Sequence, residues 1–281
     1  MNLRSRSFSA LAMFGLLFGL MPISPVHAST AIQAGDLIRG TSFSAVYYYG
    51  EDGFRYVFPN EKTYKTWYTD ANGDMDFSSV ITLTDQELSG IQMGGNITYK
   101  PGVKMIKINS DPKTYAVDAN GELRWVTSED VAVGMFGTAW NTMIDDVPDG
   151  FFGNYTIGSS LDTVEDAQAF QMQFLSHDNR TISEDKGLTA MTFMDIVDMQ
   201  YYNPEDKSTT ITIHAGQTVM FANVDSVNHT FTADDDSWGT GTLTPLQNFV
   251  RRFSTPGTYT FHCSYHPEMI GTVIVTTGDT M

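Results

Sequence analysis

Cysteine and basic residues are the scarcest features of this 281-residue chain. It has one cysteine, Cys263, so an intrachain disulfide is excluded. Lys and Arg total 16 against 33 Asp and Glu, for a formal net charge of −17. Because this charge repels phosphate backbones and anionic lipid surfaces, we expect no nucleic-acid partner. Charged residues are only 17% of the chain, and the abundance of Gly, Tyr and Phe predicts a mainly β fold.

Long apolar runs are also missing, apart from one near the start. Arg4 and Arg6 precede an apolar run over residues 8–20, which ends before the small-residue sequence Val26-His27-Ala28. A positive segment, a short apolar run and an A-x-A-like site are typical of a secretory signal, and the run is too short to span a bilayer. We therefore predict a signal peptide over residues 1–28, a periplasmic or extracellular product, and no membrane insertion after cleavage.

Residues 29–158 contain two related units. Residues 47–57 read as a strand, a Gly-containing turn and a strand, and a helix-start signal follows at residues 59–61. Residues 115–126 repeat the hairpin, with another helix start at residues 128–130; the two match with an offset of one residue between Gly and Arg. We predict a smaller α+β domain of hairpin-helix repeats. It carries no catalytic constellation, and we expect a binding or scaffold module that contacts a cell surface or a polymer.

One loop of this region partly matches a calcium-binding pattern. Asp70, Asn72, Asp74 and Asp76 occupy positions 1, 3, 5 and 7 of such a loop. Met75 replaces the Gly of position 6, and the bidentate Glu of position 12 is absent. The departures favour a solvated acidic turn, with calcium as the alternative.

The remaining sequence is predicted to form a helix and linker over residues 159–189 and a β domain over residues 190–281. Residues 164–174 have helical apolar spacing, whereas residues 184–187 and His177 read as polar loop and surface. Later strands alternate with period two, which places Cys263 on an inward face with Tyr259 and Phe261, and His214 and His262 toward solvent. The pattern predicts a sandwich of short antiparallel strands.

The last loop carries the chemistry of the chain. Cys263, His266 and Met269 supply a thiolate, an imidazole and a thioether within seven residues. With one further histidine, for which His229 is the candidate, they form the two-His, one-Cys set with a weak Met ligand that suits copper.

These residues carry a family resemblance. Residues 209–275, with Asn228-His229-Thr230 and Cys263-x-x-His266-x-x-Met269, resemble the cupredoxins, the blue type 1 copper proteins of the amicyanin, plastocyanin and pseudoazurin kind. The resemblance implies that His229, Cys263 and His266 are strong copper ligands and Met269 the axial one. Thr230 departs from the Asn that many members have after the first histidine, where a side-chain amide helps to lock the cysteine loop.

The resemblance implies an exported electron carrier that shuttles single electrons through one copper ion. The acidic run at residues 234–236, with Glu268, favours basic redox partner proteins, with simple solubility of the chain as the alternative role of these acids. The alternative is a copper-binding and delivery module without a redox partner. An enzyme is not expected, because multicopper catalysis needs further histidine-rich centres, and only five histidines follow residue 28.

Overall fold

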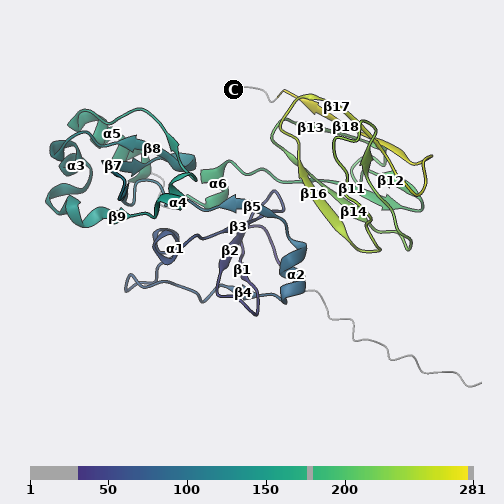
Figure 1. The fold of residues 1–281 in the computed structure, drawn as a ribbon, viewed down its shortest axis with the longest axis horizontal. Helices are drawn as coiled ribbons and strands as arrows, with labels where there is room; N and C mark the ends of the chain where they lie inside the picture. The colour runs from purple at the N-terminus through teal and green to yellow at the C-terminus, as the bar shows by residue number, and fades with distance from the viewer. Residues whose placement is uncertain (1–30, 176–179, 278–281) are drawn as a thin grey trace, which may run out of the picture. The chain divides into compact units, whose positions relative to one another are not determined.

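The computed structural model describes residues 31–175 and 180–277, so the predicted signal peptide and His177 lie outside the described residues. Within these two ranges, no helix is both long and apolar enough to cross a bilayer. In this described part of the chain, the strands form four sheets, two before residue 158 and two after residue 191 (Figure 1).

The first repeat unit is a five-stranded sheet with one helix on each face. Its strands are β1 (Leu37–Arg39), β2 (Val46–Tyr49), β3 (Arg55–Val57), β4 (Ile81–Thr82) and β5 (Met93–Asn96), in the order β4-β1-β2-β3-β5. Helix α1 (Glu61–Trp67) packs Tyr64 into the core on one face, and α2 (Asp85–Gly90) packs Leu88 into the core on the other. The covered sheet is stable because both of its apolar faces are buried.

The second unit has the same topology. Its strands are β6 (Met105–Ile108), β7 (Asp111–Val117), β8 (Glu122–Trp125), β9 (Ile144–Asp146) and β10 (Thr156–Ile157), in the order β9-β6-β7-β8-β10. Its helices are α3 (Glu129–Phe136), α4 (Asp149–Phe152) and the short 3-10 helices η1 (Ala119–Gly121) and η2 (Gly137–Met143). Strand for strand, the order of the first sheet is repeated.

The hairpin of each unit turns at a glycine in the left-handed region. Gly53 has φ 78° and Gly121 has φ 69°, a conformation that favours glycine. These two positions are 68 residues apart, as are the helix N-caps Asn60 and Ser128. The repeat therefore aligns through hairpin and helix without the one-residue offset that the sequence indicated, since Arg55 is equivalent to Leu123.

Two helices follow the second unit. Helix α5 (Val164–Leu175) matches the predicted helix and buries Ala167, Phe170 and Phe174. The prediction of a loop over residues 184–187 is wrong in part, because Ile182–Lys186 form the short helix α6. Thr181 and Glu184 form a reciprocal capping box, and Gly187 ends the helix in the left-handed conformation, so the signals were present but read as polar loop.

The C-terminal strands form a sandwich of two four-stranded sheets. One has the order β12-β11-β14-β16 and the other β13-β18-β17-β15. The bounds are β11 (Thr192–Val197), β12 (Gln200–Tyr202), β13 (Thr210–His214), β14 (Thr218–Asn223), β15 (Thr232–Ala233), β16 (Asn248–Arg252), β17 (Gly257–His262) and β18 (Ile270–Thr276). The predicted mainly β fold with a C-terminal sandwich is confirmed.

The sandwich differs from the prediction in strand direction. Strands β11 and β14 are parallel, and so are β13 and β18, whereas the other pairs are antiparallel. The parallel partners are distant in sequence, and a chain that returns by a long crossover pairs in parallel more readily than a hairpin does. Between the sheets lies an aromatic core that includes Phe221, Phe231 and Phe261, each with no exposed surface.

Candidate metal centre

Two loops at one end of the sandwich carry the four predicted ligands. His229 lies between β14 and β15, held by reciprocal backbone hydrogen bonds with Leu243 of 3.1 and 2.8 Å. The other three lie between β17 and β18. There the amide of His266 donates to the carbonyl of Cys263, that of Met269 to His266, and that of Cys263 to Met269, over 2.9 to 3.1 Å. These bonds fix a tight turn that sets the spacing of the three side chains.

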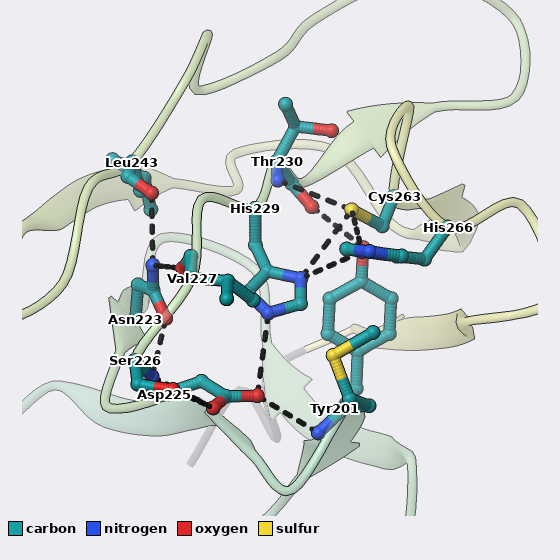
Figure 2. A network of polar contacts seen from close by, with 11 residues as sticks. Tyr201, Asn223, Asp225, Ser226, Val227, His229, Thr230, Leu243, Cys263 and His266 are labelled. Carbon is teal, nitrogen blue, oxygen red and sulfur yellow. Dashed lines mark hydrogen bonds and ion pairs between the residues drawn. The ribbon is translucent and has the colours of Figure 1, made fainter.

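The thiol and the two imidazoles converge on one point (Figure 2). Cys263 Sγ lies 3.6 Å from His229 Nδ1 and 3.7 Å from His266 Nδ1, and the two nitrogens are 3.2 Å apart. A point equidistant from the corners of a triangle with these sides lies about 2.0 Å from each corner. This is within about 0.3 Å of the bonds that zinc makes to an imidazole nitrogen, about 2.0–2.1 Å, and to a cysteine sulfur, about 2.3 Å. The donor set and its spacing therefore fit a first-row metal ion.

Burial differs among these side chains. His229 and Cys263 have no exposed surface, and His266 is partly exposed. Burial lowers the pKa of His229; the hydrogen bond from its ring to Asp225 opposes this shift and nearby His266 adds to it. A lowered pKa keeps the imidazole neutral at neutral pH, which is the form that binds a metal.

Asp225 supports the buried histidine from the far side of its ring. In Figure 2 the imidazole of His229 lies between the sulfur of Cys263 and the carboxylate of Asp225, with Nε2 3.3 Å from Asp225 Oδ2. The same carboxylate accepts amide hydrogen bonds from Met199 (2.9 Å) and Ser226 (2.7 Å), and these amides hold the pKa of Asp225 below its usual range. A carboxylate at Nε2 favours the proton there and leaves the Nδ1 lone pair for a metal.

Thr230 locks the cysteine loop through its hydroxyl. Its Oγ1 accepts a 2.8 Å hydrogen bond from the amide of Ser264, and the hydroxyls of Thr232 and Ser264 lie 3.0 and 3.2 Å away. Its own amide donates to Cys263 Sγ at 3.4 Å. A threonine hydroxyl thus bridges the two loops at the position where the sequence departs from the usual asparagine.

Comparison with known proteins agrees with this architecture. Residues 170–275 match the family profile described as Cupredoxin-like domain. The C-terminal part of the chain is a cupredoxin. A comparison with curated proteins found no match.

Solved cupredoxins are among the similar structures. Amicyanin from Paracoccus versutus is 26% identical, with 31% of this chain and 81% of that chain covered and a TM-score of 0.27. A purple cupredoxin from Nitrosopumilus maritimus is 24% identical over 30% of this chain and 99% of that one, with a TM-score of 0.27. A copper-containing nitrite reductase from Thermus scotoductus SA-01 is 24% identical over 30% and 22%, with a TM-score of 0.28.

Met269, His214 and His262 are the other residues for which the sequence made a prediction. Met269 is 4% exposed within the cupredoxin core cluster that includes Cys263. His214 is exposed, as predicted, with Nδ1 2.9 Å from the Thr276 hydroxyl, and half-buried His262 pairs with Asp234 at 2.7 Å. Neither joins the cluster.

The acidic loop of the first repeat unit satisfies its carboxylates internally. Asp70 Oδ1 accepts amide hydrogen bonds from Asn72 (2.8 Å) and Asp74 (2.9 Å), and Asp76 accepts one from Ser78. In the described ranges, the group of His, Cys, Asp and Glu ligand atoms close enough to share an ion is that of His229, Cys263 and His266. The carboxylates of the acidic loop are not gathered in this way.

The sequence reading missed Asp225 as a site residue. The available signal was an acidic residue in a turn, four positions before the ligand histidine. The sequence does not indicate that the loop places this carboxylate against Nε2. The distant amide of Met199, which orients Asp225, has no sequence signal at all.

Proposed function

We propose that this chain is an exported blue copper protein that transfers single electrons through a type 1 site, with His229, Cys263 and His266 as strong ligands and Met269 as the axial ligand. The observation that supports it best is the convergence of one thiol and two imidazole nitrogens, 3.2 to 3.7 Å apart, on a cupredoxin scaffold. The polarisable sulfur and the imidazoles are the donors that such copper sites use.

His229, Cys263, His266 and Met269 would hold a copper ion, which would supply one-electron chemistry. The chain supplies rigidity. His229 is fixed by Leu243 and Asp225, and Cys263 by the amide of Thr230 and the turn to Met269. Because protein contacts orient these donors, they would rearrange little between the two charge states of a bound ion, and this would lower the barrier to electron exchange.

His266 is the proposed point of electron entry and exit. It is the partly exposed member of the cluster, and its loop neighbour Tyr265 is 51% exposed, with its hydroxyl 2.8 Å from that of Thr242. The loop before His229 exposes Val224 (54%) and Val227 (44%). Exposed apolar side chains in the two loops that carry the ligands would exclude water from a briefly docked partner.

A basic partner fits the charge of the cupredoxin domain. Asp234, Asp235 and Asp236 lie in the turn after β15, and Glu268 is exposed in the ligand loop. Hydrogen bonds from Thr260 and His262 hold the pKa of Asp234 below its usual range, so this carboxylate is charged at neutral pH. Negative charge of this kind accelerates association with a positively charged partner and is screened by salt.

The burial of the ligands favours electron transfer over copper delivery. His229 and Cys263 have no exposed surface, so an acceptor protein could approach the ion only past His266. A delivery site needs ligands that an acceptor can replace one after another. The rate at which a chelator removes cupric ion tests this, because release within seconds would favour delivery.

Copper titration of the purified mature chain tests the proposal. We expect an intense visible thiolate-to-copper band and narrow copper hyperfine splitting in electron paramagnetic resonance after addition of one equivalent of cupric ion. Cys263→Ser should abolish the band, and His266→Ala should replace the narrow splitting with a wide one. His214→Ala is the matched control, because this histidine lies on β13 outside the cluster. Colourless wild-type protein would contradict the proposal.

A catalytic role is tested separately, because a nitrite reductase is among the similar structures. The chain spans 22% of the length of that enzyme. We propose that the copper-loaded chain alone carries electrons without turnover of nitrite. Steady reduction of nitrite by the loaded protein with an artificial donor would contradict the non-catalytic assignment.

A further inference from the structure

Each repeat unit has a cleft between its hairpin and the start of its first helix. The first cleft, in the first unit, has a volume of about 340 Å³ and is lined among others by Val46, Phe58 and Tyr64. The second cleft, in the second unit, has a volume of about 320 Å³ and is lined by Thr114, Val126 and Trp125 among others. Both lie at the small end of the range of ligand pockets, which is about 300–1,000 Å³.

The two clefts occupy equivalent positions of the duplicated fold. With the offset of 68 residues that relates Asn60 to Ser128, lining residues 44–46 correspond to 112–114, residues 58–61 to 126–129, and residue 64 to residue 132. The strand pairing gives the same equivalence, since Tyr47 pairs with Val57 and Tyr115 with Trp125. Two clefts of similar size and equivalent lining are features of the repeated unit and not accidents of one loop.

Aromatic rings form a large part of both linings. The second cleft includes Trp125, which is 38% exposed, and half-buried Trp140, two of the four tryptophans of the chain. The first cleft includes Phe77, which is 48% exposed and stacks on Tyr64 with ring centroids 4.8 Å apart. Exposed aromatic rings in a concave site are characteristic of binding surfaces, because they offer a large flat apolar contact.

Polar groups repeat beside the rings. Glu61 and Glu129 are equivalent, both are exposed, and neither carboxylate has a hydrogen bond or ion pair with another residue in the described part of the chain. In the second cleft, Lys113 adds a cation, with Nζ 4.8 Å from the centroid of Trp125. Each cleft therefore combines a flat apolar surface with groups that can bind hydroxyls.

We propose that the two clefts are a duplicated binding site for a neutral polysaccharide, each taking one or two sugar rings. A pyranose ring has an apolar face of C–H groups that stacks on an aromatic ring, and a rim of hydroxyls that donate to carboxylates and accept from lysine. The volumes suit a short stretch of such a chain. The net charge of −17 disfavours an anionic polymer.

Repetition of the cleft also fits a polymer. A chain of identical sugars offers the same short epitope many times, so two weak and similar sites on one protein gain retention from multivalency when the polymer reaches both. This inference is independent of the copper site, and either can fail without the other.

Titration of the full mature chain with three soluble neutral hexasaccharides tests the proposal: cellohexaose, maltohexaose and chitohexaose. Tryptophan fluorescence and calorimetry report the binding. We expect saturable binding of at least one sugar, with two sites per chain. Trp125→Ala and Phe77→Ala should each weaken one site by up to about tenfold, the upper end of what a single aromatic contact contributes. Only the Phe77→Ala variant should keep the full fluorescence change of the second cleft.

Phe193→Ala is the matched control, since Phe193 is an exposed aromatic residue (42%) on β11, outside both clefts. Thermal unfolding checks that each variant remains folded. Absence of binding for all three sugars, or unchanged affinity at both sites in the two cleft variants, would overturn the proposal. The same titration is made with an anionic polysaccharide and with a proline-rich peptide, and saturable binding only to one of these would also overturn it.

Discussion

The repeat units and the cupredoxin domain use β-sheets in different ways. Each repeat unit covers both faces of one sheet with helices, and its equivalent positions recur 68 residues apart, as Asn60 and Ser128 do. The cupredoxin domain buries one aromatic core between two sheets and brings two loops together at one end. The difference shows why the cluster of candidate metal ligands belongs to the sandwich. The loops at one end of the sandwich bring metal-ligand atoms together from distant parts of the chain. The repeated unit, in contrast, presents two equivalent surfaces.

The largest effect that would separate the cupredoxin domain from the repeat units is expected from a substitution in the aromatic core beneath the ligand loop. A Cβ on Gly271 would lie 2.5 Å from Phe261 and 3.1 Å from Tyr201, and both of these rings are buried. Gly271→Ala should therefore lower the free energy of unfolding of the cupredoxin domain by about 1–3 kcal/mol. Urea unfolding of the metal-free protein, followed by aromatic circular dichroism, measures it.

Gly257→Ala is the matched control, because its Cβ would meet nothing closer than Tyr259 at 3.7 Å, an ordinary contact. Equal unfolding midpoints for the two variants would show that the core beneath the loop is looser than the structure indicates.

The next largest effect, on copper affinity, is expected from the Asp225 carboxylate beside Nε2 of His229. In Asp225→Asn the amide keeps the shape of the side chain but loses the charge that favours a proton on Nε2, so the orientation and basicity of the imidazole change. We expect copper affinity to fall by about 10- to 100-fold. Competition with a chelator of known affinity measures this change.

Asp235→Asn is the control for Asp225→Asn. It removes an equal charge from an exposed carboxylate that accepts from Ser237 and has no contact with the cluster. A similar loss of affinity in both variants would mean that net charge, and not the contact with His229, determines the effect.

The hydroxyl of Thr230 should contribute less, because part of its network is open to solvent. Thr230→Val removes the acceptor of the Ser264 amide while keeping the shape of the side chain, and should cost about 1 kcal/mol of stability. The reduction potential of the copper-loaded protein should shift as well, because the loop that carries Cys263 loses a restraint. Thr230→Ser should restore both quantities. A serine variant that behaves like the valine variant would show that the effect does not come from loss of the hydroxyl alone.

Predictions from the sequence were most accurate for features that contiguous residues form. Cys263, His266 and Met269 lie in one turn, and the hairpins with their helix starts at Asn60 and Ser128 are each formed by contiguous residues. The contacts that needed the structure are long-range. The amide of Met199 orients Asp225 across 26 residues, and strands such as β4 and β9 join their sheets by parallel pairing after a long excursion. Local periodicity and capping signals cannot specify such partners.

The smallest predicted effect tests whether the two repeat units are equivalent in energy as well as in topology. Asn60 accepts from the amide of Thr63, and Ser128 from that of Val131, so each satisfies one of the free amides at the start of its helix. Asn60→Ala and Ser128→Ala should each cost about 1 kcal/mol in urea unfolding.

The exchanges Asn60→Ser and Ser128→Asn should be nearly neutral, because both residue types are effective N-caps. Unequal costs for the two alanine variants, with neutral exchanges, would show that one helix is held mainly by packing and the other by its cap. Helices α1 and α3 do differ in what they bury, Thr63 and Tyr64 in one and Val131, Ala132 and Met135 in the other. Equal costs would therefore mean that the duplication has preserved the capping interaction independently of the core.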